Sequence, residues 1–197
     1  MKASAILIAA ALATTATLAP ASAPAQGSPV ESPRMLSFGL GGGVSVPVSN
    51  AKDALKNGVN GQGFVRLNLA ALPIRPRLDF TFQKFDPKSA AVTGPAIPAA
   101  GPSSVLAGVA NIQVPLLRGA VEPYIVAGLG AYNVKSESGS TSTSTTQFGV
   151  NGGAGLIVKL GIVSLYAEGR LDNVYTDKGV LDTKTIQVVP VTFGIVY

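Results

Sequence analysis

Apolar and polar residues alternate along the C-terminal stretch of the chain, Thr185–Tyr197. A period of two predicts a β-strand, because successive side chains of a strand point to opposite faces. One face is a nearly unbroken apolar stripe: Gln187, Val189, Val191, Phe193, Ile195 and Tyr197. An open edge strand this apolar would aggregate, whereas a strand that closes a barrel in lipid has a paired edge and an apolar face in contact with hydrocarbon.

Further segments show the same alternation and predict the other strands. They are Met35–Pro47, Gln62–Leu72, Arg77–Phe85, Ser103–Val114, Pro123–Val134, Gln147–Lys159 and Val163–Asn173. Each is close to the roughly 9–11 residues that a tilted strand needs to cross a membrane. We therefore expect an all-β fold: an eight-stranded antiparallel up-and-down transmembrane β-barrel after an N-terminal signal peptide.

In each predicted strand, bulky apolar residues share one face and small or polar residues share the other. In Arg77–Phe85, for example, Leu78, Phe80 and Phe82 alternate with polar residues. The polar faces of the first, fifth and sixth strands are rich in glycine, which suits a crowded barrel interior. Aromatic residues near the strand ends approximate two membrane girdles. One comprises Phe64, Phe85, Tyr132, Phe148 and Tyr175, and the other Phe38, Tyr124, Phe193 and Tyr197.

Long and short connections alternate between the predicted strands. The long ones are 48–61, 86–102, 135–146 and 174–184, and the shorter ones are 73–76, 115–122 and 160–162. Outer-membrane barrels have long loops outside the cell and short turns in the periplasm, so this order predicts periplasmic termini. The Ser/Thr/Gly-rich tract Lys135–Thr146 has the composition of a solvated loop, either an interaction surface or filler, and we favour filler.

The N-terminus predicts export. Residues 1–25 have a charged Lys2, an apolar stretch and small residues before the cleavage site, as in a secretory signal peptide. Cleavage after Ala23 or after Ala25 fits the pattern, and we prefer Ala25 because Pro24 follows the first site. The predicted organisation is a signal peptide at 1–25, a flexible leader at 26–34 and a barrel domain at 35–197.

Composition narrows the class of protein further. Charged residues make up 13% of the chain, about half the usual share of a soluble domain. After the signal peptide, no apolar run approaches the roughly 20 residues of a membrane-spanning helix. The formal net charge is +5 and the charges are scattered, so we expect no nucleic-acid partner.

The chain offers little catalytic or metal-binding chemistry. It contains no cysteine and no histidine, so a Ser–His hydrolase cannot be built, and the sequence shows no zinc-ligand spacing. It also has no phosphate-binding glycine loop and no calcium loop. We therefore expect neither enzymatic activity nor a cofactor.

Five charged residues fall on the faces predicted to point inward: Arg66, Arg77, Asp79, Glu168 and Arg170. Side chains nearly fill the interior of an eight-stranded barrel, and charges buried there must be paired. We favour a salt-bridge network that plugs the lumen. A narrow ion path lined by these groups and an acid–base pair of Glu168 with Asp79 are the alternatives.

At this point the chain resembles the small eight-stranded outer-membrane barrels of the OmpA/OmpX-like type. The resemblance rests on the signal peptide, on Pro123–Tyr132, on the inward Glu168-x-Arg170 and on Thr192–Tyr197. It implies residence in the outer membrane of a Gram-negative-type bacterium. It also implies insertion by the barrel-assembly machinery after escort by periplasmic chaperones.

The resemblance implies roles for the C-terminus as well. The assembly signal of such barrels would be formed here by Phe193, Gly194, Ile195 and Tyr197. No peptidoglycan-binding domain follows Tyr197, so we expect no wall anchor of the OmpA kind.

The sequence thus favours a monomeric outer-membrane barrel with a mostly plugged lumen. Its role would be structural, or interactive through the outer loops, with a narrow pore as a sub-option. The rival is a soluble periplasmic or secreted lipocalin-like barrel that binds an apolar ligand. That barrel would need its apolar faces inside.

Overall fold

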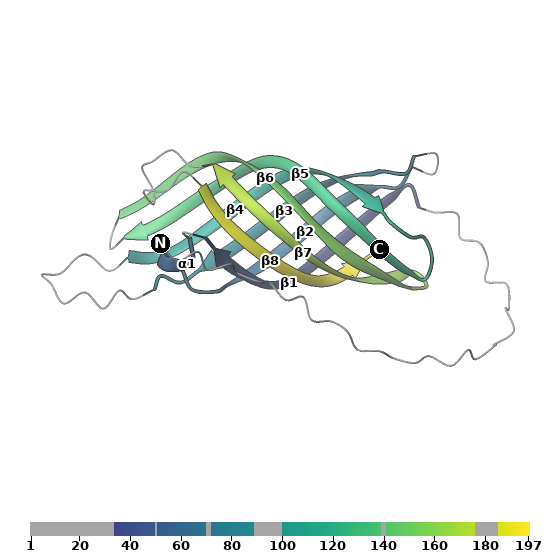
Figure 1. Cartoon of the computed structure of the whole chain (residues 1–197), viewed down its shortest axis with the longest axis horizontal. Coiled ribbons are helices and arrows are strands. Elements are labelled where there is room, and N and C mark those ends of the chain that lie inside the picture. Colours follow the sequence, from purple (N-terminus) through teal and green to yellow (C-terminus); the bar gives the residue numbers. More distant parts are fainter. Residues whose placement is uncertain (1–33, 50, 70–71, 89–99, 139–140, 176–184) are drawn as a thin grey trace, which may run out of the picture. The chain divides into compact units, whose positions relative to one another are not determined.

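The computed structural model describes residues 34–49, 51–69, 72–88, 100–138, 141–175 and 185–197. These residues form a closed antiparallel barrel in which each strand pairs with its neighbours in the sequence (Figure 1). The strands are β1 Leu36–Val48, β2 Gly58–Leu67, β3 Arg75–Phe85, β4 Ala100–Pro115, β5 Val121–Ser138, β6 Thr141–Leu160, β7 Val163–Tyr175 and β8 Thr185–Val196. The predicted eight-stranded up-and-down barrel is confirmed.

Pairing of the first strand with the last closes the barrel. The β1–β8 register runs from Gly39 opposite Val196 to Val48 opposite Gln187. Beyond it, Phe38 and Tyr197 exchange two backbone hydrogen bonds of 2.8 Å. The apolar C-terminal strand is therefore paired on both sides, as its pattern predicted.

Strand β2 begins and ends earlier than the sequence pattern predicted. Its first residues, Gly58–Gly61, belong to the connection 48–61 that the sequence predicts. They pair instead with the end of β1, from Ser45 opposite Gly58 to Gly42 opposite Gly61. Small residues facing each other let the two backbones form a regular ladder despite their low strand propensity.

The prediction that 135–146 forms a solvated loop is wrong for most of the tract. β5 and β6 continue through it as paired strands, with Lys135 opposite Ser144 and Asn133 opposite Thr146. Side-chain hydrogen bonds join these rungs, from Asn133 Nδ2 to Thr146 Oγ1 at 3.0 Å and from Ser144 Oγ to Asn133 Oδ1 at 3.0 Å. Threonine favours strands, and cross-strand hydroxyl contacts support the hairpin without a buried core.

The connection between β1 and β2 contains a short helix that the pattern did not predict, α1 Ala51–Ala54. Just after it, Leu55 forms an isolated bridge with Pro87, beyond the end of β3. The buried Ala51 and Leu55 pack with Phe85. Within the described ranges, none of the helical segments has the length and apolar character to cross a membrane.

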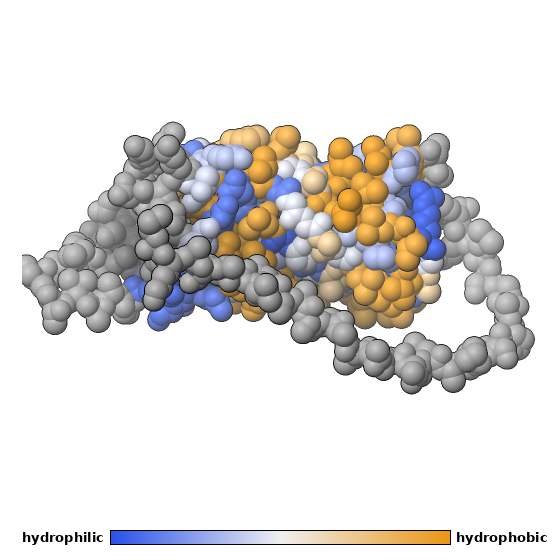
Figure 2. Space-filling model, in the orientation of Figure 1, coloured by the Kyte–Doolittle hydropathy of each residue, from blue (hydrophilic) through white to orange (hydrophobic). Residues whose placement is uncertain are grey.

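The predicted facing of the strands is confirmed. Large apolar side chains lie exposed on the outer wall of the barrel, and Figure 2 shows hydrophobic residues over much of its visible side. Examples are Phe38, Leu40, Leu78, Phe80, Phe82, Leu106, Ile112, Leu129, Phe148, Phe193 and Ile195. Polar side chains from the same strands are buried inside, including Gln62, Thr81, Gln83, Asn111 and Thr192.

Two buried apolar clusters lie inside the barrel, one toward each end of the strands. The first, near the long connections, comprises Ala51, Leu55, Phe85, Val105, Ala107, Val109, Tyr132, Val134, Val174, Ile186 and Val188. The second, near the short turns, comprises Phe64, Tyr124, Val126, Ile157, Tyr166 and Val196. We call these the loop-end and turn-end clusters.

The clusters correct the girdle assignment of the aromatic residues. Phe64, Phe85, Tyr124 and Tyr132 are at most 4% exposed and pack inside the barrel, so they do not face lipid. Phe38, Phe148, Tyr175, Phe193 and Tyr197 do lie exposed on the outside. The assignment failed because it used position along the strand and ignored the side to which each residue points. The predicted signal peptide and nearly all of the leader fall outside the described residues.

The outward position of Phe80, in the middle of β3, gives a direct test of the facing. Phe80→Arg places a guanidinium against hydrocarbon and should destabilise the barrel in lipid by about 2–4 kcal/mol. The measurement is urea unfolding in phospholipid vesicles, with Phe80→Leu as the apolar control. Equal unfolding midpoints for the two variants would show that this face does not contact lipid.

Candidate functional site

The centre of the barrel interior holds a compact group of charges. The Arg77 guanidinium on β3 binds two carboxylates at once. Its Nε lies 2.6 Å from Asp79 Oδ1, and its Nη1 and Nη2 lie 2.6 Å and 3.0 Å from the two oxygens of Glu168. All three side chains are almost completely buried. Because Glu168 belongs to β7, these bonds span the lumen.

Arg170, two residues after Glu168 on β7, completes a neutral quartet of two guanidinium groups and two carboxylates. Its Nη1 donates to Asp79 Oδ2 at 2.6 Å, and its Nε lies 3.5 Å from Glu168 Oε1. We call Arg77, Asp79, Glu168 and Arg170 the central quartet. Period-two spacing on β3 and β7 puts each pair on the inner face.

Neutral side chains from three other strands also donate to the carboxylates. Tyr124 Oη donates to Glu168 at 2.7 Å, and Asn111 Nδ2 donates to Asp79 at 2.9 Å. Gln62 Nε2 lies 3.2 Å from Asp79 and 3.3 Å from Glu168. Every carboxylate oxygen of the quartet therefore accepts at least one side-chain hydrogen bond, which leaves little capacity for acid–base chemistry.

Close packing holds the quartet in place. Arg77 Cζ lies 3.8 Å from the centre of the Phe64 ring, and that ring meets Tyr166 edge-on at 5.5 Å. On β6, Gly155 faces Tyr124, and a Cβ at this position would lie 2.4 Å from the Tyr124 hydroxyl. The glycine-rich inner face therefore makes room for the aromatic rings that support the charges.

A second charged group lies nearer the short turns. Arg75 forms a two-pronged ion pair with Glu122, and Lys159 Nζ lies 3.3 Å from the same carboxylate. The sequence pattern missed this group because Arg75 and Glu122 fell in the predicted turns 73–76 and 115–122. Arg75, Arg77 and Asp79 alternate with period two. Starting the predicted third strand at Arg75 instead of Arg77 would therefore have placed this arginine on the inner face.

Arg66, the remaining predicted lumen charge, lies inside the barrel but outside the quartet. It is 7% exposed, and its Nε and Nη1 have no hydrogen-bond partner among the described residues. In the β2–β3 ladder it lies opposite Arg77. The structure therefore brings four of the five predicted charges together and leaves the fifth beside a group of the same sign.

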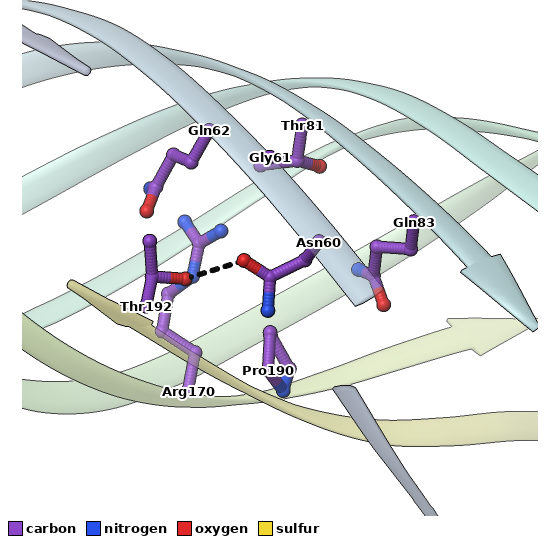
Figure 3. A pocket seen from close by; sticks show the side chains of 8 residues that line it. All are labelled: Asn60, Gly61, Gln62, Thr81, Gln83, Arg170, Pro190 and Thr192. Carbon is purple, nitrogen blue, oxygen red and sulfur yellow. Dashed lines mark hydrogen bonds between the residues drawn. The ribbon is translucent and has the colours of Figure 1, made fainter. Parts of the chain in front are cut away.

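The quartet borders a narrow polar hollow on its loop-end side (Figure 3). Its wall consists of Asn60, Gly61, Gln62, Thr81, Gln83, Arg170, Pro190 and Thr192. Thr192 Oγ1 donates to Asn60 Oδ1 at 3.0 Å across it. The β7–β8 ladder is interrupted here, opposite Pro190, which has no N–H to donate.

Beyond the hollow, Asp172 is 2% exposed and accepts a hydrogen bond from Gln83 Nε2 at 2.9 Å. The sequence pattern placed Asp172 inward but did not include it among the lumen charges. Within the described residues, no three His, Cys, Asp or Glu side chains come together in an arrangement that could hold a metal ion.

The residues of the predicted assembly signal lie on β8 and just after it. Phe193, Ile195 and Tyr197 point outward and are 61%, 48% and 54% exposed. Gly194 points inward, where a Cβ would lie 2.5 Å from the Tyr166 ring. Arg34 Cζ lies 4.1 Å from the centre of the Tyr197 ring.

Comparison with known proteins identifies the fold independently. A family model described as "Outer membrane protein beta-barrel domain" matches residues 8–189. The search of curated proteins found no match.

Solved structures of similar fold include three bacterial outer-membrane barrels. Neisserial surface protein A has a TM-score of 0.63 at 14% identity, over 82% of this chain and 95% of that one. A major outer membrane protein from Thermus thermophilus has a TM-score of 0.58 at 13% identity, over 82% of this chain and 98% of that one. Ail, the attachment invasion locus protein of Yersinia pestis, has a TM-score of 0.50 at 14% identity, over 82% of this chain and 97% of that one. At these identities the likeness shows the fold alone.

The contact between Gly155 and Tyr124 predicts a position-specific effect on β6. Gly155→Ala should destabilise the folded barrel by about 1–3 kcal/mol, because the new methyl group displaces the ring that donates to Glu168. Gly152→Ala is the matched control, since a Cβ there meets nothing within 4 Å. Urea unfolding in detergent micelles compares the two, and equal losses would rule out the packing explanation.

The quartet predicts a large cost for removing one carboxylate. Glu168→Ala leaves Arg77 with a single buried counter-charge and should lower the free energy of unfolding by about 3–5 kcal/mol. The double variant Arg77→Met with Glu168→Met should recover part of the loss. The idea fails if the thermal midpoint of Glu168→Ala equals that of the wild type.

Proposed function

Because the chain belongs to the outer membrane protein β-barrel domain family, we propose that it is an integral barrel with a largely closed lumen. Its role is structural or depends on interactions at its surface-exposed end. The family and the fold place the protein in the outer membrane of a Gram-negative-type bacterium. The closed lumen and the surface role are the parts that are proposed.

The observation that carries the proposal is the layering of the interior. The central quartet crosses the lumen from β3 to β7, and donors from β2, β4 and β5 fill the space around it. Apolar clusters lie on both sides of it. A hydrated ion would have to break short ion pairs and then cross an apolar layer, which opposes conduction.

The surface role is supported by the length of the β5–β6 hairpin. β5 has 18 residues and β6 has 20, whereas β7 has 13 and β8 has 12. The pairing of β6 with β7 ends at Gly149, so the preceding part of β6 extends past the last rung of β7. Its exposed residues there include Ser142, Thr143, Ser144 and Thr146. We propose that this polar hairpin projects outside the cell and that both termini are periplasmic.

Membership of the family supports the remaining proposals. We propose that the protein has no enzymatic activity and is a monomer. The barrel-assembly machinery would recognise Phe193, Ile195 and Tyr197, with Gly194 between them, after periplasmic chaperones deliver the chain. The outward orientation of the three bulky side chains supports this recognition, because a partner can reach them before the barrel enters lipid.

The lipocalin-like alternative is not supported. A barrel that holds an apolar ligand needs an apolar interior and a polar outer wall. This barrel has large apolar residues outside and the charged quartet at its centre. The facing of its strands is therefore the reverse of what that function needs.

Planar-bilayer recording tests the closed lumen. The chain without its predicted signal peptide, residues 26–197, would be refolded in detergent. Only material with a heat-dependent gel shift would be used, because the shift reports a folded barrel. We expect no steady conductance steps from this material. Reproducible steps that change ion selectivity in Arg170→Gln would instead establish a pore lined by the quartet.

A further inference from the structure

Arg66 is a buried cation that the central quartet does not use. Its Nε and Nη1 are buried without a hydrogen-bond partner among the described residues, and the residue is 7% exposed. A buried guanidinium whose donors lack partners is unfavourable, because it has lost water and gained nothing in return. The other lumen arginines, Arg75, Arg77 and Arg170, all bind carboxylates. The contrast indicates that Arg66 has a partner that the described residues do not supply.

The surroundings of Arg66 are positively charged. Arg66 lies opposite Arg77 in the β2–β3 ladder, Arg75 lies two residues from Arg77 on the same inner face, and the carboxylate bound by Arg75 is Glu122. Glu122 already binds Arg75 and Lys159, and Arg77 is shared between Asp79 and Glu168. Among the described residues, the turn-end group of Arg66, Arg75 and Lys159 therefore has three cations for one carboxylate.

A neutral donor lies in the same region. Gln113 on β4 is 0% exposed, and neither its Nε2 nor its Oε1 has a hydrogen-bond partner in the part of the chain that the structure describes. It lies opposite Arg75 in the β3–β4 ladder. The ion pair from Arg75 to Glu122 joins β3 to β5 and so crosses β4, where Gln113 is located. Arg66 and Gln113 are two independent sets of unsatisfied donors near one ion pair.

We propose that this turn-end mouth of the lumen binds a phosphate-bearing anion, with Arg66 as its principal ligand and Arg75, Lys159 and Gln113 as supporting groups. A phosphate group accepts several hydrogen bonds at once and matches the planar guanidinium. It also reduces the repulsion among the three cations. The anion enters from the turn end, where the Lys159 side chain is 47% exposed and that of Arg75 is 15% exposed.

The phosphate could be free or could belong to a phospholipid headgroup, and both supply the same chemistry. At the opposite end of the lumen, Ala51 and Phe85 of the loop-end cluster are only 3% and 1% exposed. The site is distinct from the quartet, so it does not depend on whether the lumen conducts.

The test uses the refolded chain in a maltoside detergent that contains no phosphate. Sodium phosphate should raise the midpoint of the heat-dependent gel shift saturably, relative to sodium chloride of equal ionic strength, because a ligand that binds the folded state stabilises it. Phosphorus NMR of the added phosphate reports binding directly. Arg66→Met should weaken the affinity for phosphate about tenfold or more.

Three variants make the result specific. Arg118→Met removes an exposed cation from the β4–β5 turn and should leave phosphate binding unchanged. Arg66→Lys keeps the charge but loses the planar donor group, so it should restore binding only in part. Gln113→Met replaces the amide with a side chain of nearly the same volume and should weaken binding without affecting the barrel's gel shift in chloride.

The outcomes separate cleanly. If phosphate acts no more strongly than chloride, or equally on the wild type and Arg66→Met, the proposal is overturned. Equal losses in Arg118→Met and Arg66→Met would also overturn it, since net charge would then explain the effect. In phospholipid nanodiscs, an effect of added phosphate that persists identifies a free anion as the ligand. If added phosphate has no effect in nanodiscs, and the Arg66 Nε–H resonance there already has the chemical shift that phosphate produces in detergent, the ligand is the phospholipid headgroup.

Discussion

Closure of the sheet is the constraint on which this structure depends. Hydrocarbon offers no hydrogen bonds, so each backbone N–H and C=O in the membrane must be paired within the protein. The β1–β8 ladder meets this demand, and the two bonds between Phe38 and Tyr197 extend it past the end of β8. Closure also encloses a narrow interior. At Gly43 on β1, a Cβ would lie 1.9 Å from the Val191 carbonyl oxygen, so only glycine fits where the two strands meet.

Once the interior is enclosed, its charges have to compensate one another across the lumen. Arg77 and Glu168 are 91 residues apart in the sequence but lie 2.6 Å apart at their closest atoms. Such a pair forms only when β3 and β7 are in correct register, so the quartet favours one arrangement of the strands over shifted ones. Buried ion pairs often contribute little net stability. Specifying the register is therefore the more general consequence of the quartet.

Alternation along the sequence was sufficient to predict the strands and the faces of their residues, because successive side chains of a strand point to opposite faces. It could not predict which inward charges meet, since that depends on tilt and register around the ring. Arg66 and Arg77 both point inward, yet Arg77 binds two carboxylates while Arg66 Nε and Nη1 find no partner among the described residues. The expected connections were wrong in several places. Arg75 and Glu122 were expected in turns, and 58–61 and 135–146 were expected in loops. In each of these places, pairing with a neighbouring strand overrode the local preference.

The interior charge is unevenly distributed along the barrel axis, and this gives its two ends different properties. The central quartet is neutral, the described residues of the turn end have an excess of cations, and Asp172 lies toward the loop end, where it accepts a hydrogen bond from Gln83. The loop-end cluster supplies apolar side chains on that side, whereas the Lys159 side chain at the turn end is 47% exposed. If the lumen is closed as proposed, a small solute would meet positively charged side chains at the turn end and apolar side chains at the loop end. Under the same proposal, a large partner at the loop end would contact the outer rim and the β5–β6 hairpin, because apolar side chains would separate that side from the lumen.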